Sequence, residues 1–144
     1  NIHKNLNKIK IKKKLNIMMN LLNSKKYKLN FNIFKFLCYN PHCSENATIG
    51  NEDKLINQLI SKYFKNILGP YPADSAFINF KKNTLFISTY HDQALIPYKI
   101  INKKGFNFTL GLNYRRLSPA HGTAKDIKFK NKSDNTSYLA CMLS

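Results

Sequence analysis

The residue types best suited to chemistry are concentrated between Tyr90 and Asp126. The whole chain has four His, two Arg and seven carboxylates, and this stretch holds two of the His, both Arg and two of the carboxylates. Side chains of these types bind metal ions, transfer protons and hold anionic substrates. A site assembled from loops predicts such a cluster, although packing at strand ends could also place polar residues there.

The elements expected to position these residues alternate between strands and helices. Strands are predicted at the apolar runs 34–39, 77–80, 84–88 and 106–112. A helix is predicted over residues 51–67, where apolar residues recur at helical spacing, and the Gly69-Pro70 pair should end it. This alternation predicts an α/β domain.

Polar side chains follow three of the predicted strands. His42 comes after the first, His91 and Asp92 after the third, and Arg115 and Arg116 after the last. In open α/β sheets, ligands bind beyond the carboxyl ends of the strands, so we expect these clusters to lie at one edge. Taken alone, a histidine at a strand end is more often structural than a metal ligand. There is no GxGxxG or GxxxxGK[ST] motif, and no loop of either nucleotide-binding kind is predicted.

The composition limits the class of protein. At 144 residues the chain fits one domain, and its 43% hydrophobic content allows a compact core. The formal net charge of +17 would suit a nucleic-acid or membrane-surface binder. The excess is almost entirely Lys and accompanies abundant Asn and Ile, whereas a dedicated binder should be richer in Arg. Nucleic-acid binding therefore stays a secondary interpretation.

Cysteine content and hydropathy bear on the compartment. The three Cys are odd in number and lack metal-ribbon spacing, so no disulfide framework is predicted and a reducing cytoplasm is expected. Neither a membrane span nor a secretory signal is visible. Residues 1–33 are rich in Lys and Asn, and we expect them to be weakly helical or disordered, with apolar residues between Leu15 and Leu22 on one face. The chain begins with Asn1, and we expect it to be a fragment of a longer protein.

Six short blocks together carry a family resemblance. In chain order they are Asn40-Pro41-His42, Gly69-Pro70-Tyr71-Pro72-Ala73-Asp74-Ser75, Tyr90-His91-Asp92-Gln93-Ala94 with Lys99, Asn107-Phe108-Thr109-Leu110-Gly111-Leu112, Arg116, and His121-Gly122-Thr123-Ala124. They resemble the 4-hydroxythreonine-4-phosphate dehydrogenase family of vitamin B6 biosynthesis, over residues 34–142. The likeness corresponds to roughly the C-terminal half of a family member. It implies an isocitrate/isopropylmalate dehydrogenase-like α/β sheet with flanking helices, incomplete here, formed by residues 34–144.

The resemblance also implies an activity. The family oxidises 4-phosphohydroxy-L-threonine with NAD and a divalent metal (zinc, magnesium or cobalt), with loss of carbon dioxide, on the route to pyridoxal 5'-phosphate. It binds the metal through three His, and His42 and His91 fall on two of these positions, while the third lies in the absent half. Imidazole nitrogens suit such ions, which act as Lewis acids. The family site forms at a homodimer interface, so this chain is expected to complete a site only with another polypeptide.

Other matching positions imply roles in binding. Lys99, Asn107 and Arg116 match substrate-binding positions, and two cations with an amide suit a phosphate and a carboxylate. Asp74 and Asp92 are expected near the catalytic centre, although Asp74 could instead cap a helix after the Pro-rich turn. The turn expected to bind NAD consists of His121, Gly122, Thr123 and Ala124.

The chain departs from the family pattern in two places. The Gly-rich run after His42 is replaced by Cys43-Ser44-Glu45-Asn46-Ala47, and Ala94 stands in place of Gly. Because Gly tolerates positive φ and other residues do so poorly, the resemblance does not predict the geometry of these loops.

Alternative functions remain open from the sequence. The chain could be an inactive remnant of the enzyme, a related dehydrogenase for phosphorylated threonate or erythronate, or a basic nucleic-acid-binding protein. The favoured interpretation is part of a cytoplasmic, homodimeric dehydrogenase with a small phosphorylated substrate and no nucleic-acid or membrane partner.

Overall fold

The computed structural model describes residues 7–144 except 25, 28, 103, 121, 123 and 124. The chain forms two compact units, residues 1–97 and residues 98–144. The boundary expected after residue 33 stays a prediction.

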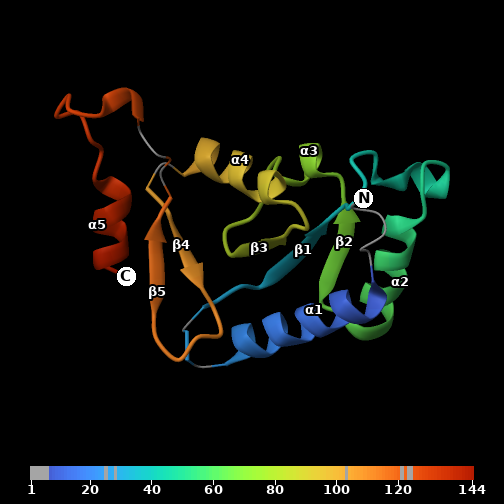
Figure 1. The fold of residues 1–144 in the computed structure, drawn as a ribbon. Coiled ribbons are helices and arrows are strands. Elements are labelled where there is room, and N and C mark those ends of the chain that lie inside the picture. Colours follow the sequence, from blue (N-terminus) through green and yellow to red (C-terminus); the bar gives the residue numbers. More distant parts are fainter. Residues whose placement is uncertain (1–6, 25, 28, 103, 121, 123–124) are drawn as a thin grey trace. The chain divides into compact units, whose positions relative to one another are not determined.

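The first unit contains a sheet and flanking helices (Figure 1). Its elements are α1 (Lys8–Asn23), β1 (Ile33–Leu37), the 3-10 helix η2 (Cys43–Ala47), α2 (Glu52–Tyr63), β2 (Ile67–Tyr71), α3 (Ala73–Ala76) and β3 (Thr84–Ile87). Helix α4 (His91–Ile101) begins in this unit and crosses into the second. The second unit contains β4 (Phe106–Thr109), β5 (Arg116–Pro119), the 3-10 helix η3 (Lys125–Ile127) and α5 (Thr136–Met142).

The sheet of the first unit has the strand order β2-β1-β3, and both pairings are parallel. In the register of the central strand, Phe34 pairs with Ile67 of β2 on one side and with Leu85 of β3 on the other. Parallel neighbours need a crossover, and α2 supplies it between β1 and β2. The predicted α/β class, with a parallel sheet and flanking helices, is confirmed.

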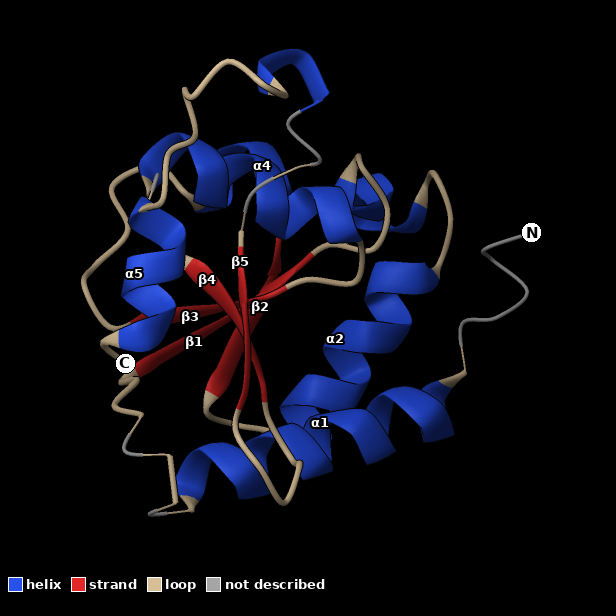
Figure 2. Cartoon of the chain, turned by 60° about the vertical axis from the view of Figure 1, so that its left-hand side comes forward, coloured by secondary structure: helices blue, strands red, loops and turns tan. Residues whose placement is uncertain are grey.

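The hydrophobic core of the first unit lies between the sheet and helices α1 and α2 (Figure 2). Phe34 and Phe36 are two positions apart in β1 and therefore point to the same face of the sheet. The buried residues that form this core with them include Leu15 and Met19 of α1, Ile56, Leu59 and Ile60 of α2, and Ile67 of β2. The apolar spacing that predicted the second helix thus marks the face that the helix buries.

Two predicted elements differ from the observed ones in the first unit. The helix predicted over 51–67 ends at Tyr63, because Ile67 begins β2 and fills the same core from a strand. The strand predicted over 77–80 is wrong: these residues follow α3 in a turn. Their aromatic rings nevertheless contact a strand of the sheet, since Phe77 lies 4.3 Å and Phe80 5.6 Å from Phe86 of β3, measured between ring centroids. Apolar content without alternation does not distinguish a strand from a packed turn.

The second unit contains an antiparallel two-stranded sheet. Strand β4 ends at Thr109, earlier than the predicted end at residue 112. Arg116, expected beyond the end of that strand, begins β5 and pairs with Thr109. Helix α5 packs against both strands of this unit.

Two further observations bear on the sequence-based expectations. Cys38 and Cys43 are joined by a disulfide, whereas the sequence predicted no disulfide framework. Five positions separate the two residues, and their Cα atoms are 5.2 Å apart, a separation that the bridge can span.

Among the described residues, no helix is long and apolar enough to cross a membrane. The cytoplasmic location stays a prediction.

Candidate functional site

The candidate site lies at the carboxyl edge of the parallel sheet. Because β1, β2 and β3 are parallel, their carboxyl ends meet at one edge. His42 comes shortly after the end of β1, Asp74 after β2, and His91 after β3. The topology of the first unit therefore brings these three predicted site residues to the same edge of the sheet, although they are spread over half of its sequence.

His42 lies at the start of a compact loop. Its imidazole is exposed, with Nδ1 3.4 Å from Oε1 of Glu45. Its backbone N–H donates to Oδ1 of Asn40 at 2.9 Å. A carboxylate at Nδ1 favours the tautomer that carries its proton there, which leaves Nε2 as the nitrogen able to bind an ion.

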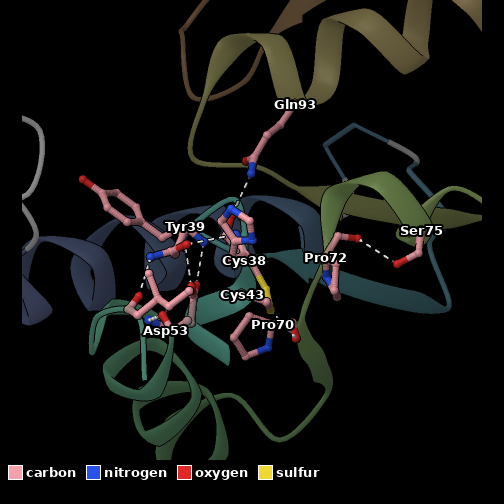
Figure 3. Close-up of a disulfide and its surroundings, with 12 residues drawn as sticks. Cys38, Tyr39, Cys43, Asp53, Pro70, Pro72, Ser75 and Gln93 are labelled. Atoms are coloured by element: carbon pink, nitrogen blue, oxygen red, sulfur yellow. Dashed lines mark hydrogen bonds between the residues drawn. A yellow bond between two sulfur atoms is a disulfide. The ribbon is translucent and has the colours of Figure 1, made fainter. Parts of the chain in front are cut away.

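His91 is the first residue of α4 and has the same kind of partner. Its Nδ1 lies 3.1 Å from Oδ1 of Asp92, and both side chains are exposed. The start of this helix is bonded to the residue that follows the central strand, because Nε2 of Gln93 donates to the carbonyl oxygen of Cys38 at 2.6 Å (Figure 3). Both predicted metal-binding His thus have a carboxylate at Nδ1, as metal-binding imidazoles commonly do.

The residues present therefore fit a divalent metal in part. They supply two imidazoles from one edge of the sheet, but a protein site for zinc needs at least three ligands. In the described part of the chain, the group of three potential ligands within 4.8 Å of one another is Cys38, Cys43 and Asp53. The two sulfur atoms of this group are bonded to each other, so its cysteines do not supply a third ligand for an ion bound by His42 and His91.

The carboxylate of Asp53 is a feature that the sequence analysis missed. Asp53 is only 3% exposed, in the first turn of α2. Its oxygens accept hydrogen bonds from the backbone N–H groups of Tyr39 at 2.6 Å and Asn40 at 3.0 Å, and from Oγ of Ser44 at 3.0 Å (Figure 3). The sequence signal that could have pointed to Asp53 was an acidic residue in the first turn of a well-predicted helix, directly after the loop that carries His42.

The run after His42 adopts left-handed backbone geometry throughout. The φ angles are 52° at Cys43, 57° at Ser44, 39° at Glu45, 59° at Asn46 and 73° at Ala47. The family resemblance implies a Gly-rich run at these positions, whereas this chain follows a positive-φ path without any Gly among them. In contrast, Ala94 lies inside α4, where Gly would weaken the helix.

Tyr90 precedes His91 and packs against Tyr39, with ring centroids 5.3 Å apart. Burial, together with a hydrogen bond with Tyr39, raises the pKa of Tyr90 to about 12. The phenol therefore ionises only at a higher pH than an ordinary tyrosine, next to the start of α4.

The predicted substrate-binding residues belong to the second unit. Asn107 pairs with Ser118, and Thr109 pairs with Arg116, so Asn107 and Arg116 lie on the same face of the two-stranded sheet. The guanidinium of Arg116 donates to Oγ1 of Thr109 at 3.0 Å and is exposed. Lys99 lies in the last turn of α4 and is also exposed.

The remaining predicted residues are placed in part. Asp74 is exposed in the first turn of α3, where Pro72, and not Asp74, is the N-cap residue. In the turn predicted to bind NAD, Gly122 is exposed, and an added Cβ there would meet no atom within 4 Å. His121, Thr123 and Ala124 lie outside the described residues.

The relatives found among known proteins share one family and one name. The family model of the pyridoxal phosphate biosynthetic protein PdxA matches residues 1–143. The 4-hydroxythreonine-4-phosphate dehydrogenase of Hydrogenobaculum sp. is 47% identical over 98 residues, which cover 67% of this chain and 31% of that protein. The protein of the same name from Aquifex aeolicus is 42% identical over 114 residues, 74% of this chain and 35% of that one. The Sulfurihydrogenibium sp. protein is 38% identical over 137 residues, 89% of this chain and 42% of that one.

A solved structure has a similar fold. It comes from Salmonella typhimurium and was provisionally described as a 4-hydroxythreonine-4-phosphate dehydrogenase. It matches with a TM-score of 0.67 and 25% sequence identity, covering 97% of this chain and 44% of the other. The chain thus spans less than half the length of the relatives that it matches.

Proposed function

Because the chain belongs to the family of the pyridoxal phosphate biosynthetic protein PdxA, we propose that it forms part of an NAD-dependent, metal-assisted dehydrogenase for 4-phosphohydroxy-L-threonine. The names of the relatives supply the reaction class. Since the chain spans less than half of their length, the proposal concerns one part of an active site. The remainder, with a third metal ligand, would come from another segment or polypeptide. We further propose an isocitrate/isopropylmalate dehydrogenase-like fold over residues 34–144 and a homodimer with the site at its interface.

The observation that carries this proposal is the pair of imidazole–carboxylate contacts at one sheet edge. His42 with Glu45, and His91 with Asp92, each have a carboxylate at Nδ1 and would offer Nε2 to the ion. When bound, the ion supplies a Lewis acid and NAD supplies the hydride acceptor. The role of this chain is to hold the two nitrogen ligands and to fix their tautomer.

The second unit is proposed to bind the charged ends of the substrate. Asn107 and Arg116 share one face of the β4–β5 sheet, which places an amide and a guanidinium on the same surface. A guanidinium can grip a phosphate or carboxylate through two hydrogen bonds, and the amide can add a third. Lys99 would add a point charge.

Asp74, Asp92 and residues 121–124 also have proposed roles. Asp92 would orient His91, and Asp74, at the same sheet edge, would contact the substrate. We assign NAD binding to residues 121–124 on the family resemblance.

The proposal is tested by NADH formation at 340 nm. The assay contains 4-phosphohydroxy-L-threonine, NAD and a divalent metal, and it compares the chain alone with the chain mixed with the N-terminal half of a relative. His42→Ala and His91→Ala should each abolish the activity of the mixture. His3→Ala is the matched control, since no role is assigned to that residue.

Activity only in the mixture, lost in both variants and kept in the control, would support a half-site that needs a partner. Absence of turnover in every combination would refute the catalytic proposal and leave an inactive remnant. Turnover with phosphorylated threonate or erythronate instead would move the chain to the related dehydrogenase branch.

A further inference from the structure

The buried carboxylate of Asp53 connects α2 to the loop that carries His42. It receives three hydrogen bonds: from the backbone N–H groups of Tyr39 and Asn40, and from the hydroxyl of Ser44. The backbone N–H of Asp53 in turn lies 3.4 Å from Oγ of Ser44. A carboxylate with 3% exposure is costly to bury unless donors surround it, and here the loop supplies the donors.

A second set of bonds runs from this carboxylate to His42. Asn40, whose backbone N–H is bonded to Asp53, accepts the backbone N–H of His42 at its side-chain Oδ1. Its Nδ2 donates to the carbonyl oxygen of Ile49 at 2.8 Å, which closes the loop on its far side. Asp53 is therefore linked to the backbone of His42 through a single intervening residue.

The loop needs such an anchor because of its backbone geometry. Five consecutive non-Gly residues, Cys43 to Ala47, have positive φ, a conformation that L-residues disfavour. A free chain of this sequence would leave that region, so interactions within the fold must hold it there. Ser44 is inside the run, is 2% exposed, and donates directly to Asp53.

From these contacts we propose that Asp53 is the positioning residue of the predicted metal site, holding the His42 loop in its left-handed path so that the imidazole reaches the sheet edge. The inference rests on the proposed function for the role of His42 as a ligand. Asp53 does not serve as a ligand, because its oxygens are buried and accept three hydrogen bonds. It acts through Asn40 and Ser44.

The test uses the full chain and two variants of graded severity. Asp53→Asn keeps the shape of the side chain but replaces one of its two acceptor oxygens with an NH₂ donor, which would face the N–H of Tyr39 in place of Oδ1 or the N–H of Asn40 in place of Oδ2. Ser44→Ala removes one donor and leaves the backbone bonds intact, so it keeps the test decisive if Asp53→Asn does not fold. Asp126→Asn is the matched control, because that carboxylate is exposed and lies in η3 of the second unit. Circular dichroism confirms that each variant is folded.

The first readout is the ¹H NMR signal of the His42 ring, assigned with His42→Ala among the four His of the chain. We expect it to shift and broaden in Asp53→Asn and, to a smaller extent, in Ser44→Ala, while the His91 signal and the Asp126→Asn spectrum stay unchanged. The second readout is Zn²⁺ affinity, measured by calorimetry on the chain mixed with the N-terminal half of a relative. Loss of a supporting partner should weaken it about tenfold or more in Asp53→Asn.

These readouts separate the two proposals. An unchanged His42 signal in folded Asp53→Asn would overturn the positioning role, whatever the catalytic assay shows. A shifted signal with unchanged Zn²⁺ affinity would also overturn it, because the loop would then not serve the ion. If the parent chain binds no Zn²⁺ in the mixture, the metal site of the proposed function fails, and the positioning of a metal ligand falls with it.

Discussion

Replacing Ala47 with Gly should stabilise the protein, which is unusual for a substitution that removes a methyl group. Ala47 ends the left-handed run of the His42 loop with a φ of 73°. An L-residue in this region costs about 1–2 kcal/mol relative to its preferred conformations, and Gly avoids that cost. Against this, Gly gains freedom in the unfolded chain, which costs about 0.4–1 kcal/mol. The expected net gain in the free energy of unfolding is therefore about 0.5–1 kcal/mol.

The matched control is Ala94→Gly, the same chemical change at the other position where the chain departs from the family. Ala94 is half-buried like Ala47, but it lies inside α4. In a helix the substitution should destabilise by about 1 kcal/mol. The cost in the unfolded chain is common to both variants, so their difference reports the native backbone and should be about 1.5 kcal/mol.

Urea unfolding followed by circular dichroism measures both values. Gly50→Ala tests the same loop in the opposite direction: Gly50 has a φ of 96°, and an added Cβ would collide with the carboxylate of Glu52. It should lose stability. If Ala47→Gly destabilises as much as Ala94→Gly, then Ala47 does not have the left-handed geometry, and the loop does not need the anchor proposed for Asp53.

Three other predictions address different parts of the molecule. The pKa of Tyr90 is raised to about 12, so its neutral form stabilises the fold fully below pH 10, and this stabilisation is lost as the pH rises to 12. Tyr90→Phe should remove this part of the pH dependence of the free energy of unfolding. It should also remove one high-pH phenolate transition from the absorbance at 295 nm. Without a reductant, iodoacetamide should label only Cys141 in the unfolded chain, whereas labelling at Cys38 and Cys43 would contradict the disulfide. Reduction of the disulfide should lower the free energy of unfolding by about 2 kcal/mol, given the short loop that it closes. Arg116→Lys should raise KM for the phosphorylated substrate about tenfold in the mixture with the N-terminal half of a relative, while leaving the folded structure intact, because an ammonium cannot replace a bidentate guanidinium. An unchanged KM would exclude Arg116 from substrate binding.

Sequence reasoning predicted the architecture of the first unit where periodicity was strong. The apolar positions of α2 and the runs at β1 and β3 predicted an α/β sheet, and the positions of His42 and His91 after those strands predicted that they share one edge. The same reasoning failed for α4. Its first residues are polar and it contains Pro97, so neither periodicity nor propensity indicated a helix.

The anchoring role of Asp53 was not predictable from spacing, because it depends on a contact that only the folded loop creates. The acidic residue in the first turn of α2 is ordinary for a helix start, and nothing local shows that its carboxylate is buried. The left-handed path of residues 43–47 was likewise hidden. Every residue there is non-Gly, and the usual sequence signal for positive φ is Gly.

The parallel pairing of β1 with β3 also determines when the candidate site comes into existence during folding. Ile33 pairs with Thr84, so this contact joins segments far apart in the chain, and such contacts form slowly because a long loop must close first. Until it forms, the sheet does not hold His42 and His91 at a common edge. An ion that needs both would therefore bind the finished fold and slow its unfolding, and it would do little to accelerate folding.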